Sequence, residues 1–368
     1  MSIPPQVLQT ECHAPVIGVL VGEGVGPEVV PAALDLLDAL SAWSGRRFTI
    51  RHGGCIGRTA LAEGQASLSD DVAAFVTDIF AAGGVLFCGP GGDRFVYELR
   101  ARFDLYCKFT PLQPQPALAT LGPLRADRVA GVDIIAVREN VSGVYQGAWS
   151  LDGVAGQRVA RHEFHYREHE VNRILGTALA LAGTRRKQLC VVVKEAGVPS
   201  ISALWMERAH ALAAGTGTAL TILDFDNAVY QLIADPARFD VIVSPNMFGD
   251  VLADAGALLL GSRGLSYSGN FGPQARAAYQ TGHGAAWDIA GQNVANPLAQ
   301  MLSLAMMLEQ SFSWAEGAAL VRRAIADVLA SGARTRDIAQ SGCELLPTAA
   351  MAARVRQRLE FLQAASGK

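Results

Sequence analysis

The sequence lacks the two motifs that most often mark a nucleotide-binding site. No GxGxxG follows a strand-like run, and GxxxxGK[ST] does not occur. Any dinucleotide that this chain binds is therefore held by neither a Rossmann loop nor a P-loop.

Other absences narrow the class of protein. The 31 basic and 34 acidic residues leave a formal net charge of −3, which argues against a nucleic-acid partner. No apolar run approaches the ~18 residues that span a bilayer, and residues 1–15 lack a secretory pattern, so we expect a cytoplasmic protein without a membrane partner. The six cysteines include no CxxC pair, which predicts buried free thiols in a reducing compartment.

Short apolar runs alternate with longer helical patterns, which is typical of an α/β architecture. Strands are expected at residues 15–21, 84–88, 133–137, 189–193 and 239–243. Helices are expected at residues 28–40, 170–182, 202–214, 297–311 and 314–331. No Pro/Gly/Ser-rich linker divides the 368 residues, so we expect one folded unit with two lobes, the chain crossing between them more than once.

Acidic residues provide the first candidate site. Asp250 and Asp254 lie four residues apart in the apolar stretch 246–261, so on a helix they share one face. A hard divalent cation such as Mg²⁺ or Mn²⁺ relieves the repulsion between such carboxylates. The helix dipole and one exposed side chain explain the same pair without a metal. Asp226, between a strand pattern and a helix pattern, is a third ligand or a helix cap.

Basic and phenolic residues provide the second candidate site. Arg100 and Arg138 lie in apolar contexts, and a guanidinium matches carboxylates bidentately, which indicates a polyanionic small acid as ligand. An internal salt bridge of Arg138 with Glu139 or a neighbour is the alternative. Lys194, at the end of an apolar run, is a solvated strand end or, near a metal and arginines, a general base whose pKa falls towards neutrality. Tyr145 is an acid in that site or a structural hydroxyl.

These pieces occur together, and the combination resembles the isocitrate/isopropylmalate dehydrogenase family. The similarity covers about residues 16–308 and is carried by the segments 22–28, 137–145, 246–261 and 283–297. In the first segment Glu23 stands where relatives more often carry aspartate.

The resemblance implies a fold and an assembly. The expected fold is α/β and not of the Rossmann type, with a large mixed sheet flanked by helices and two lobes. Residues 1–108 and 260–368 would form the larger, cofactor-binding lobe, and residues 109–259 the smaller lobe with the dimer interface. The family forms obligate homodimers with shared active sites. Lys194 and Asp226 would then serve the neighbouring subunit's site, and residues near 150–165 would form an intersubunit clasp.

The resemblance also implies residue roles. The positions that match the metal ligands of the family, for Mg²⁺ or Mn²⁺, are Asp226, Asp250 and Asp254. Tyr145 and Lys194 match the catalytic tyrosine and lysine, and Arg100 and Arg138 match arginines that grip the substrate's carboxylates. The loop that holds the adenosine half of the cofactor contains His283, Gly284, Asp288 and Asn296. Asp288 accepts hydrogen bonds from a ribose hydroxyl and repels a 2′-phosphate, so NAD is implied.

The implied reaction is the NAD-linked oxidation of a 3-substituted malate, followed by loss of the β-carboxylate as carbon dioxide. The metal chelates the 2-hydroxyl and the adjacent carboxylate and lowers the pKa of the hydroxyl. Lys194 takes the proton while hydride passes to the nicotinamide, and the same metal stabilises the enolate formed on decarboxylation. Tyr145 then protonates the enol carbon, which leaves a 2-keto acid.

The chain departs from the family pattern in the segment 105–111. Thr110 occupies the position of a substrate-binding arginine, and Lys108 that of an asparagine, so Lys108 supplies the lost charge or the substrate presents its anions differently. Ala196 stands where relatives place an asparagine that contacts the nicotinamide side. Further differences from the usual residues occur at Gln280, Ala285 and Trp287.

The helix that reads the substrate's C3 substituent in the family aligns with residues 93–98. Arg94 and Tyr97, with Val96 between them, indicate a polar or anionic substituent with an aromatic contact. We therefore hypothesise a specialised biosynthetic homologue of 3-isopropylmalate dehydrogenase that acts on an unusual substituted malate. The alternatives are a tartrate or D-malate dehydrogenase, and a catalytically weak or regulatory subunit of the same family, consistent with the changes at Thr110 and Ala196.

Overall fold

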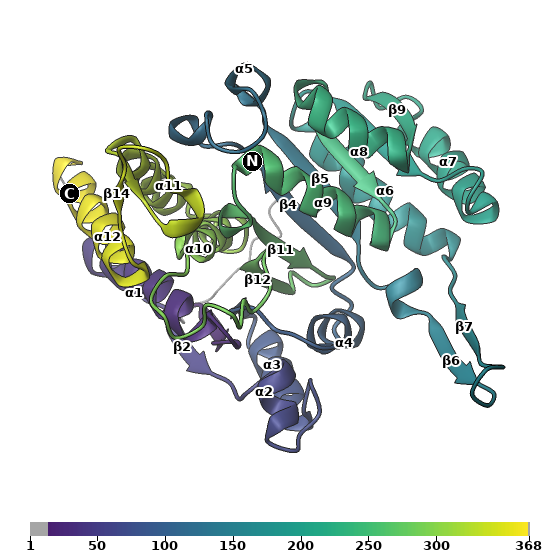
Figure 1. Ribbon diagram of the computed structural model, residues 1–368, viewed down its shortest axis with the longest axis horizontal. Helices are drawn as coiled ribbons and strands as arrows, with labels where there is room; N and C mark the ends of the chain where they lie inside the picture. The colour runs from purple at the N-terminus through teal and green to yellow at the C-terminus, as the bar shows by residue number, and fades with distance from the viewer. Residues whose placement is uncertain (1–13, 367–368) are drawn as a thin grey trace.

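A computed structural model describes residues 14–366. Ten strands form one mixed sheet (Figure 1): β1 (Val16–Leu20), β2 (Thr49–His52), β3 (Val85–Cys88), β4 (Cys107–Leu112), β5 (Ile134–Glu139), β8 (Gln188–Val193), β9 (Ala219–Asp224), β10 (Val241–Ser244), β11 (Tyr267–Phe271) and β12 (Ala277–Thr281). Two-stranded pairs are formed by β6 (Ala148–Asp152) with β7 (Val159–Glu163), and by β13 (Ala333–Arg334) with β14 (Glu344–Leu345).

Helices cover both faces of the sheet. Their bounds are α1 (Gly26–Ser44), α2 (Gly57–Ala62), α3 (Asp70–Ala81), α4 (Phe95–Arg102), α5 (Ala126–Val129), α6 (Glu168–Gly183), α7 (Pro199–Ala213), α8 (Phe225–Ala234), α9 (Asn246–Leu260), α10 (Leu298–Gln310), α11 (Ala315–Ala330) and α12 (Thr348–Ala365). A short 3₁₀ turn, η4 (Arg263–Leu265), follows α9.

The strand order is β2-β1-β3-β12-β11-β4-β5-β10-β8-β9. Neighbouring strands are parallel at both ends of this order, and the pairs β12–β11, β11–β4 and β4–β5 in the middle are antiparallel. One sheet therefore runs through the whole described chain, and its centre consists of two strands, β11 and β4, that oppose their neighbours. The large mixed sheet and the α/β class expected from the sequence are confirmed.

The two faces of the sheet are packed differently. One continuous core, which includes side chains of α1, α6, α10, α11 and α12, covers the first face. On the second face the apolar contacts form two separate clusters, one under α3 and α4 and the other under α8 and α9. The central strands between these clusters carry buried polar side chains at positions 108, 110, 268 and 270. The interruption of the second core is where a site can form.

Local sequence signals explain where the main helices begin and end. Pro27 stands in the first turn of α1, where its missing N–H costs nothing, and Gly45 ends the helix with a φ of 73°. Helix α9 follows Pro245 and ends at Gly261, whose φ is 84°. The ten strands and helices expected from periodicity are confirmed, with ends that differ by at most four residues. The central strands β4, β11 and β12 were not among the expected elements.

The hairpin formed by β6 and β7 extends away from the body of the molecule (Figure 1). It carries four exposed apolar side chains: Trp149, Leu151, Val154 and Val159. This segment coincides with the region near 150–165 for which the resemblance implies an intersubunit clasp. Of the expected lobe boundaries, 108/109 falls inside β4 and 259/260 falls at the end of α9.

The free cysteines correct one expectation. Cys88, Cys107 and Cys190 are buried, as expected, but Cys55 is exposed and Cys343 is half-buried, because neither of these two lies in a strand of the central sheet. The N-terminal pattern and Cys12 lie outside the described residues. Within residues 14–366, no helix combines the length and the apolar character that a membrane crossing requires.

Candidate active site

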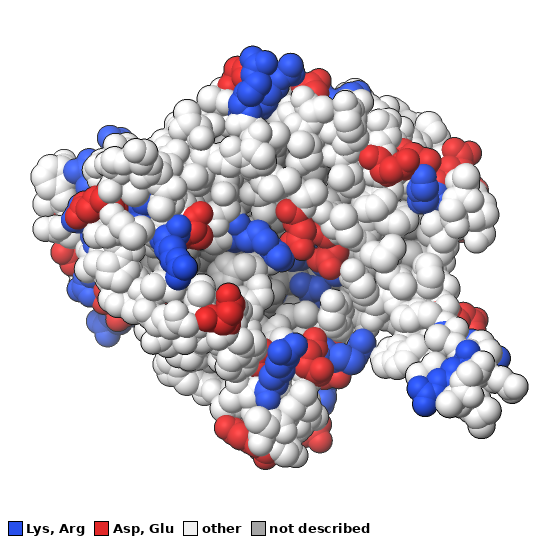
Figure 2. All heavy atoms as spheres, in the orientation of Figure 1, with Lys and Arg blue, Asp and Glu red and all other residues white. Residues whose placement is uncertain are grey.

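A row of polar residues crosses the centre of the sheet on its interrupted face. The strand register places Asn270 of β11 opposite Lys108 of β4, Lys108 opposite Arg138 of β5, and Arg138 opposite Ser244 of β10. Directly paired residues point to the same face, so these four side chains lie in line between the two apolar clusters. All four are buried. Figure 2 shows a hollow near the middle of the molecule, in which basic and acidic side chains lie close together.

Arg100 reaches this row from the last turn of α4. It is 4% exposed, and its Nε donates a hydrogen bond of 3.1 Å to Oδ1 of Asn270. Asn140 also donates to that oxygen, at 3.1 Å, so the guanidinium is held by one neutral amide, itself fixed by a second, and is not neutralised. Burial, and then the charge of Arg138, lower the pKa of Arg100 to about 9. A buried cation that is held this way favours an anionic ligand.

Lys108 is the least compensated of these cations. It is 7% exposed, and no other residue between 14 and 366 forms a hydrogen bond with its ammonium group. Burial lowers its pKa to about 7, and the positive charges of Arg100 and Arg138 act in the same direction. The resemblance had left open whether Lys108 supplies the charge missing at Thr110. Its place beside Arg138 gives it access to the same anion.

Arg138 has protein partners on the α9 side. Its Nε donates to Oδ1 of Asn246 at 3.0 Å, and its Nη1 forms an ion pair with Asp250. The internal salt bridge weighed as the alternative for Arg138 is therefore present, but its partner is Asp250 and not Glu139, because successive strand residues point to opposite faces. Glu139 instead accepts hydrogen bonds from the backbone amides of residues 141 and 142, and burial raises its pKa to about 7.

Tyr145 lies against the guanidinium of Arg138, with 5.4 Å between Cζ of the arginine and the ring centroid. Burial, followed by the negative charge of Asp250, raises the pKa of Tyr145 to about 12. The hydroxyl therefore keeps its proton at neutral pH and is placed next to a cation and a carboxylate. A tyrosine in this position can donate a proton.

Both aspartates lie on one face of α9, as the spacing predicted. Each raises the pKa of Lys108 through its negative charge. Helix α9 approaches β5 closely because position 249 is glycine, where a Cβ would lie 2.7 Å from Cβ of Arg138. Asp250 is paired with Arg138, whereas both carboxylate oxygens of Asp254 accept hydrogen bonds from Nη2 of Arg263, at 3.0 and 3.1 Å.

Asp226 and Lys194 lie together but apart from this row. Asp226 lies in the first turn of α8, just after β9, as the sequence predicted, and its Oδ1 accepts a hydrogen bond of 2.7 Å from Nζ of Lys194. Asp224 accepts a second one, at 3.3 Å. These bonds raise the pKa of Lys194, so the fall that was expected does not occur within one chain. Among residues 14–366, no three acidic, histidine or cysteine side chains are grouped closely enough to hold a metal ion.

The start of α4 lies near the mouth of the site. The guanidinium of Arg94 is 4.6 Å from the ring centroid of Trp149 in the β6–β7 hairpin and 5.5 Å from that of Tyr97. The ring centroids of Tyr97 and Tyr145 are 5.3 Å apart, and Tyr145 lies against Arg138. The start of α4 is thus connected to the cationic row through these two rings. Val96 packs against the apolar cluster under α3 and α4 and is thus partly a core residue. Sequence reasoning did not identify Trp149.

The predicted adenosine loop is anchored at its far end. Asn296 is buried and donates from Nδ2 to Asp337 at 3.1 Å. Burial lowers the pKa of His283, while the negative charge of Asp337 raises it, so His283 and Asn296 are close to the same carboxylate. Asp288 and Gly284 are exposed. Asp337 was not identified from the sequence, because it belongs to a 3₁₀ turn some forty residues further on, without a motif.

The glycine-rich segment after β1 supports this loop. The amide of Val25 donates to the carbonyl of Ala285 at 2.9 Å, and Gly24, with a φ of 60°, lies so close that a Cβ would be 1.9 Å from that oxygen. The carboxylate of Glu28 accepts hydrogen bonds from the amides of Gly291 and Asn293, at 2.7 and 2.9 Å. Residues far apart in sequence thus fix the loop against the start of α1.

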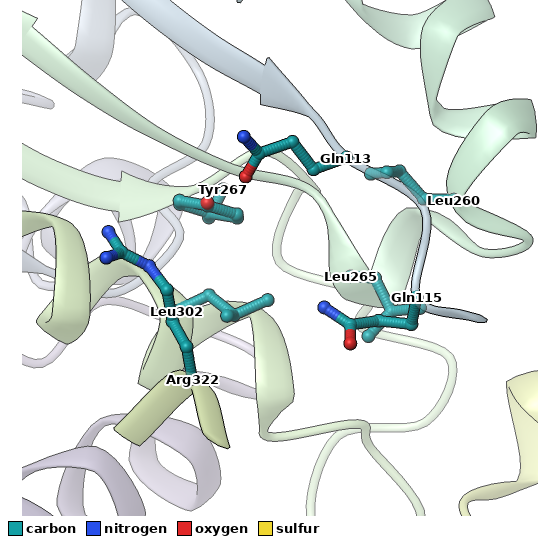
Figure 3. Close-up of a pocket in the computed structure, with 7 residues that line it drawn as sticks. All are labelled: Gln113, Gln115, Leu260, Leu265, Tyr267, Leu302 and Arg322. Carbon is teal, nitrogen blue, oxygen red and sulfur yellow. The ribbon is translucent and has the colours of Figure 1, made fainter. Parts of the chain in front are cut away.

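A separate enclosed cavity lies elsewhere in the fold (Figure 3). Its volume is about 50 Å³, and it is lined by Gln113, Gln115, Leu260, Leu265, Tyr267, Leu302 and Arg322. A cavity needs roughly 10–15 Å³ to hold one water, so this one accommodates a few waters and not a dinucleotide.

The row of buried cations is suited to bind a small anionic molecule. Residues 16–355 match the family model described as isocitrate/isopropylmalate dehydrogenase. The chain is 37% identical over 350 residues to 3-isopropylmalate dehydrogenase of Hahella chejuensis, covering 90% of this chain and 95% of that protein. It is 38% identical over 355 residues to 3-isopropylmalate dehydrogenase of Rhodospirillum rubrum, covering 90% and 94%.

A solved structure of a related enzyme has the same fold. Isocitrate dehydrogenase from Methylococcus capsulatus superposes with a TM-score of 0.82 at 28% identity, over 94% of this chain and 99% of that one. The chain belongs to the isocitrate/isopropylmalate dehydrogenase family. It is a β-decarboxylating dehydrogenase of that family, an enzyme that acts on the CH–OH group of its donor.

Proposed function

We propose that this enzyme catalyses the NAD- and divalent-metal-dependent oxidative decarboxylation of a 3-substituted malate to a 2-keto acid. The observation that carries the proposal is the row of three buried cations, Arg100, Lys108 and Arg138, beside Tyr145 and a single contacting carboxylate, Asp250. The three basic side chains and the one carboxylate leave a net positive charge in the site, which an anionic ligand compensates. A malate with its two carboxylates meets that requirement.

Two acidic residues of this chain fit a divalent metal. Asp250 and Asp254 supply hard oxygen donors from one face of α9, turned towards the substrate row. The third ligand we assign to Asp226 of a second copy of the chain, because Asp226 lies away from the other two. When bound, the metal lowers the pKa of the substrate's hydroxyl and stabilises the negative charge that develops on decarboxylation.

Proton transfer falls to two residues. Tyr145 keeps its proton, since its pKa is about 12, and donates it to the carbon that loses the carboxylate. Lys194 takes the proton of the substrate's hydroxyl in the site of the second copy. That role requires Lys194 to leave Asp224 and Asp226, whose hydrogen bonds hold its proton in the single chain, and the metal competes with the lysine for Asp226.

The cofactor is held by the loop from His283 to Asn296. The exposed carboxylate of Asp288 accepts hydrogen bonds from a ribose hydroxyl and repels a 2′-phosphate, which favours NAD over NADP. Asn296 and Asp337 anchor the loop, and Asp337 is a further candidate for contact with the adenosine half. No GxGxxG is needed, because the loop itself is fixed by Glu28 and by the amide of Val25.

A second copy of the chain is the expected partner. The β6–β7 hairpin exposes Trp149 and Leu151, and α9 exposes Met247, Val251 and Leu258. Apolar side chains that cluster on a projecting hairpin and on one helix face indicate a protein interface. We assign both surfaces to a homodimer that shares its active sites.

The C3 substituent of the substrate is read by the first turn of α4. The guanidinium of Arg94 lies over the rings of Trp149 and Tyr97, and its Nη2 donates one long hydrogen bond, 3.4 Å, to the carbonyl of Tyr145. It has no acidic partner within 4.0 Å among the described residues. A guanidinium held on aromatic faces keeps its hydrogen-bond donors available for an anion. We therefore propose that the substituent is polar or anionic.

The test is NADH formation with Mn²⁺ over a panel of 3-substituted malates that includes alkyl, carboxyalkyl and hydroxyl substituents, together with D-malate and tartrate. The Lys194→Ala variant is the control for turnover. We expect an anionic C3 substituent to give the highest kcat/KM and the variant to lose turnover. A preference for 3-isopropylmalate over every anionic analogue would overturn the substrate assignment, and silence across the panel despite NADH binding would overturn the catalytic one.

A further inference from the structure

Arg263 connects the acidic half of the site to the cofactor loop. Its Nη2 donates to both carboxylate oxygens of Asp254, at 3.0 and 3.1 Å. The side chains of the pair are 60% and 55% exposed, so the contact is weak and the guanidinium is free to turn. In this arrangement Asp254 has both of its oxygens occupied by a protein cation.

The backbone on either side of Arg263 is fixed to the cofactor loop. Oγ of Ser262 donates to Oδ2 of Asp337 at 2.5 Å and accepts the amide of Gly264 at 2.9 Å. Asn296 donates to the same oxygen of Asp337. At Gly264 a Cβ would lie 2.4 Å from that oxygen, so only glycine fits. The base of the Arg263 side chain is therefore held at the cofactor loop while its tip reaches α9.

Under the proposed function, the cofactor's diphosphate would pass between these two anchors. Hydride transfer requires the nicotinamide near the substrate row, and the loop with Asn296 takes the adenosine, so the diphosphate has to run between them. The positive charge of Arg263 lowers the pKa of His283, which places the guanidinium within electrostatic reach of that loop. No second arginine or lysine among the described residues forms an ion pair with Asp254.

A divalent metal and Arg263 compete for the same two oxygens. A metal ion at Asp254 displaces the guanidinium, because two cations on one carboxylate repel each other. We propose that Arg263, released from Asp254 when the metal binds, binds the diphosphate of the dinucleotide, so that metal and cofactor strengthen each other's binding. This inference rests on the proposed assignment of Asp254 as a metal ligand.

Binding measurements on the full-length protein test the coupling without relying on turnover. NADH affinity is measured by fluorescence with and without Mn²⁺. In the unmodified enzyme we expect Mn²⁺ to tighten NADH binding about tenfold, within the range typical of coupled sites, and NADH to tighten Mn²⁺ binding by the same factor. In Arg263→Gln both factors fall towards one. Arg125→Gln, which removes another exposed arginine paired with an aspartate, keeps the full coupling.

A second variant separates this mechanism from a direct contact between metal and diphosphate. In Asp254→Asn the guanidinium loses its carboxylate partner, so NADH is expected to bind about tenfold tighter than to the unmodified enzyme without any metal, in line with one released charge-assisted contact. Adding Arg263→Gln removes that gain. ADP-ribose shows the same pattern, because it carries the diphosphate, and adenosine does not.

The outcomes distinguish a failure of the role of Arg263 from a failure of the metal assignment. Coupling that persists in Arg263→Gln, or an Asp254→Asn variant that binds NADH no more tightly than the unmodified enzyme, overturns the inference alone. If the unmodified enzyme binds no Mn²⁺, or binds it equally well after Asp254→Asn, the metal assignment of the proposed function fails, and the inference fails with it.

Discussion

Replacing Lys108 by methionine should stabilise the ligand-free enzyme while weakening substrate binding. Methionine has a similar length and no charge, so it fits between Arg100 and Arg138. It removes the repulsion between the lysine ammonium and these two arginines. The pKa of Lys108 falls from an ordinary 10.5 to about 7, and each pKa unit corresponds to about 1.4 kcal/mol. The protonated lysine thus costs the folded state at most about 5 kcal/mol. Structural relaxation reduces this to the ~1–4 kcal/mol found when buried charges are replaced by apolar groups.

The sign of the pH dependence follows from the direction of this shift. Below about pH 7 Lys108 is protonated in both the folded and the unfolded chain, so its full cost is present. Between about pH 7 and 10.5 the unfolded chain keeps a proton that the folded chain has released, so the stability of the unmodified enzyme rises with pH relative to the variant. The advantage of Lys108→Met is therefore largest in acid and disappears in alkali.

Urea unfolding at about pH 6, 7.5 and 9 measures this difference, and steady-state kinetics measure substrate affinity. At neutral pH we expect the variant to unfold at higher urea and to raise KM at least tenfold, because the substrate loses a buried charge-assisted contact. Lys187→Met, at an exposed lysine, is the control and should change the free energy of unfolding by no more than ~0.5 kcal/mol. A Lys108→Met variant that is less stable at all three pH values refutes the reasoning.

Three further changes test other parts of the site. Tyr145→Phe should lower kcat by about 10²–10⁴-fold with little change in KM in steady-state kinetics, since only the proton donor is lost. Arg94→Leu should raise KM about tenfold for a substrate with an anionic C3 group and lower it for an alkyl one; equal effects on both would contradict the assignment. Gly24→Ala should weaken NADH binding in a fluorescence titration by displacing Ala285, because a Cβ at residue 24 would lie 1.9 Å from that carbonyl oxygen, whereas Gly45→Ala, where nothing lies within 4 Å, should not.

The parts of the fold that the sequence predicted are those with a clear pattern of apolar residues. The inner parallel strands β1, β3, β8 and β10 are largely buried and appear as short apolar runs, such as Leu189 to Val193, whereas the edge strands β2 and β9 are partly exposed. Long helices with one buried stripe were equally recognisable. The spacing of Asp250 and Asp254 placed them on one helix face, because that inference needs only the helical repeat.

The central strands could not be predicted in this way. Strand β11 contains Ser268, Gly269 and Asn270, a composition that reads as a turn, and tertiary packing overrides it. The pairing of Asn270 with Lys108, and of Lys108 with Arg138, depends on the register of three strands that are distant in sequence. Sequence alone does not determine such a register. For the same reason, the contacts of Arg263 with Asp254 and of Asp337 with Asn296 could not be predicted from local sequence.

The position of the site follows from the difference between the two faces of the sheet. Lys108 and Arg138 cannot join an apolar core, so the helices on their face pack as two clusters with the cations between them. The opposite face has no such interruption and carries one continuous core. The buried charges that lower the stability of the ligand-free enzyme are the same ones that the substrate compensates, so substrate binding should itself stabilise the fold and draw the two clusters together.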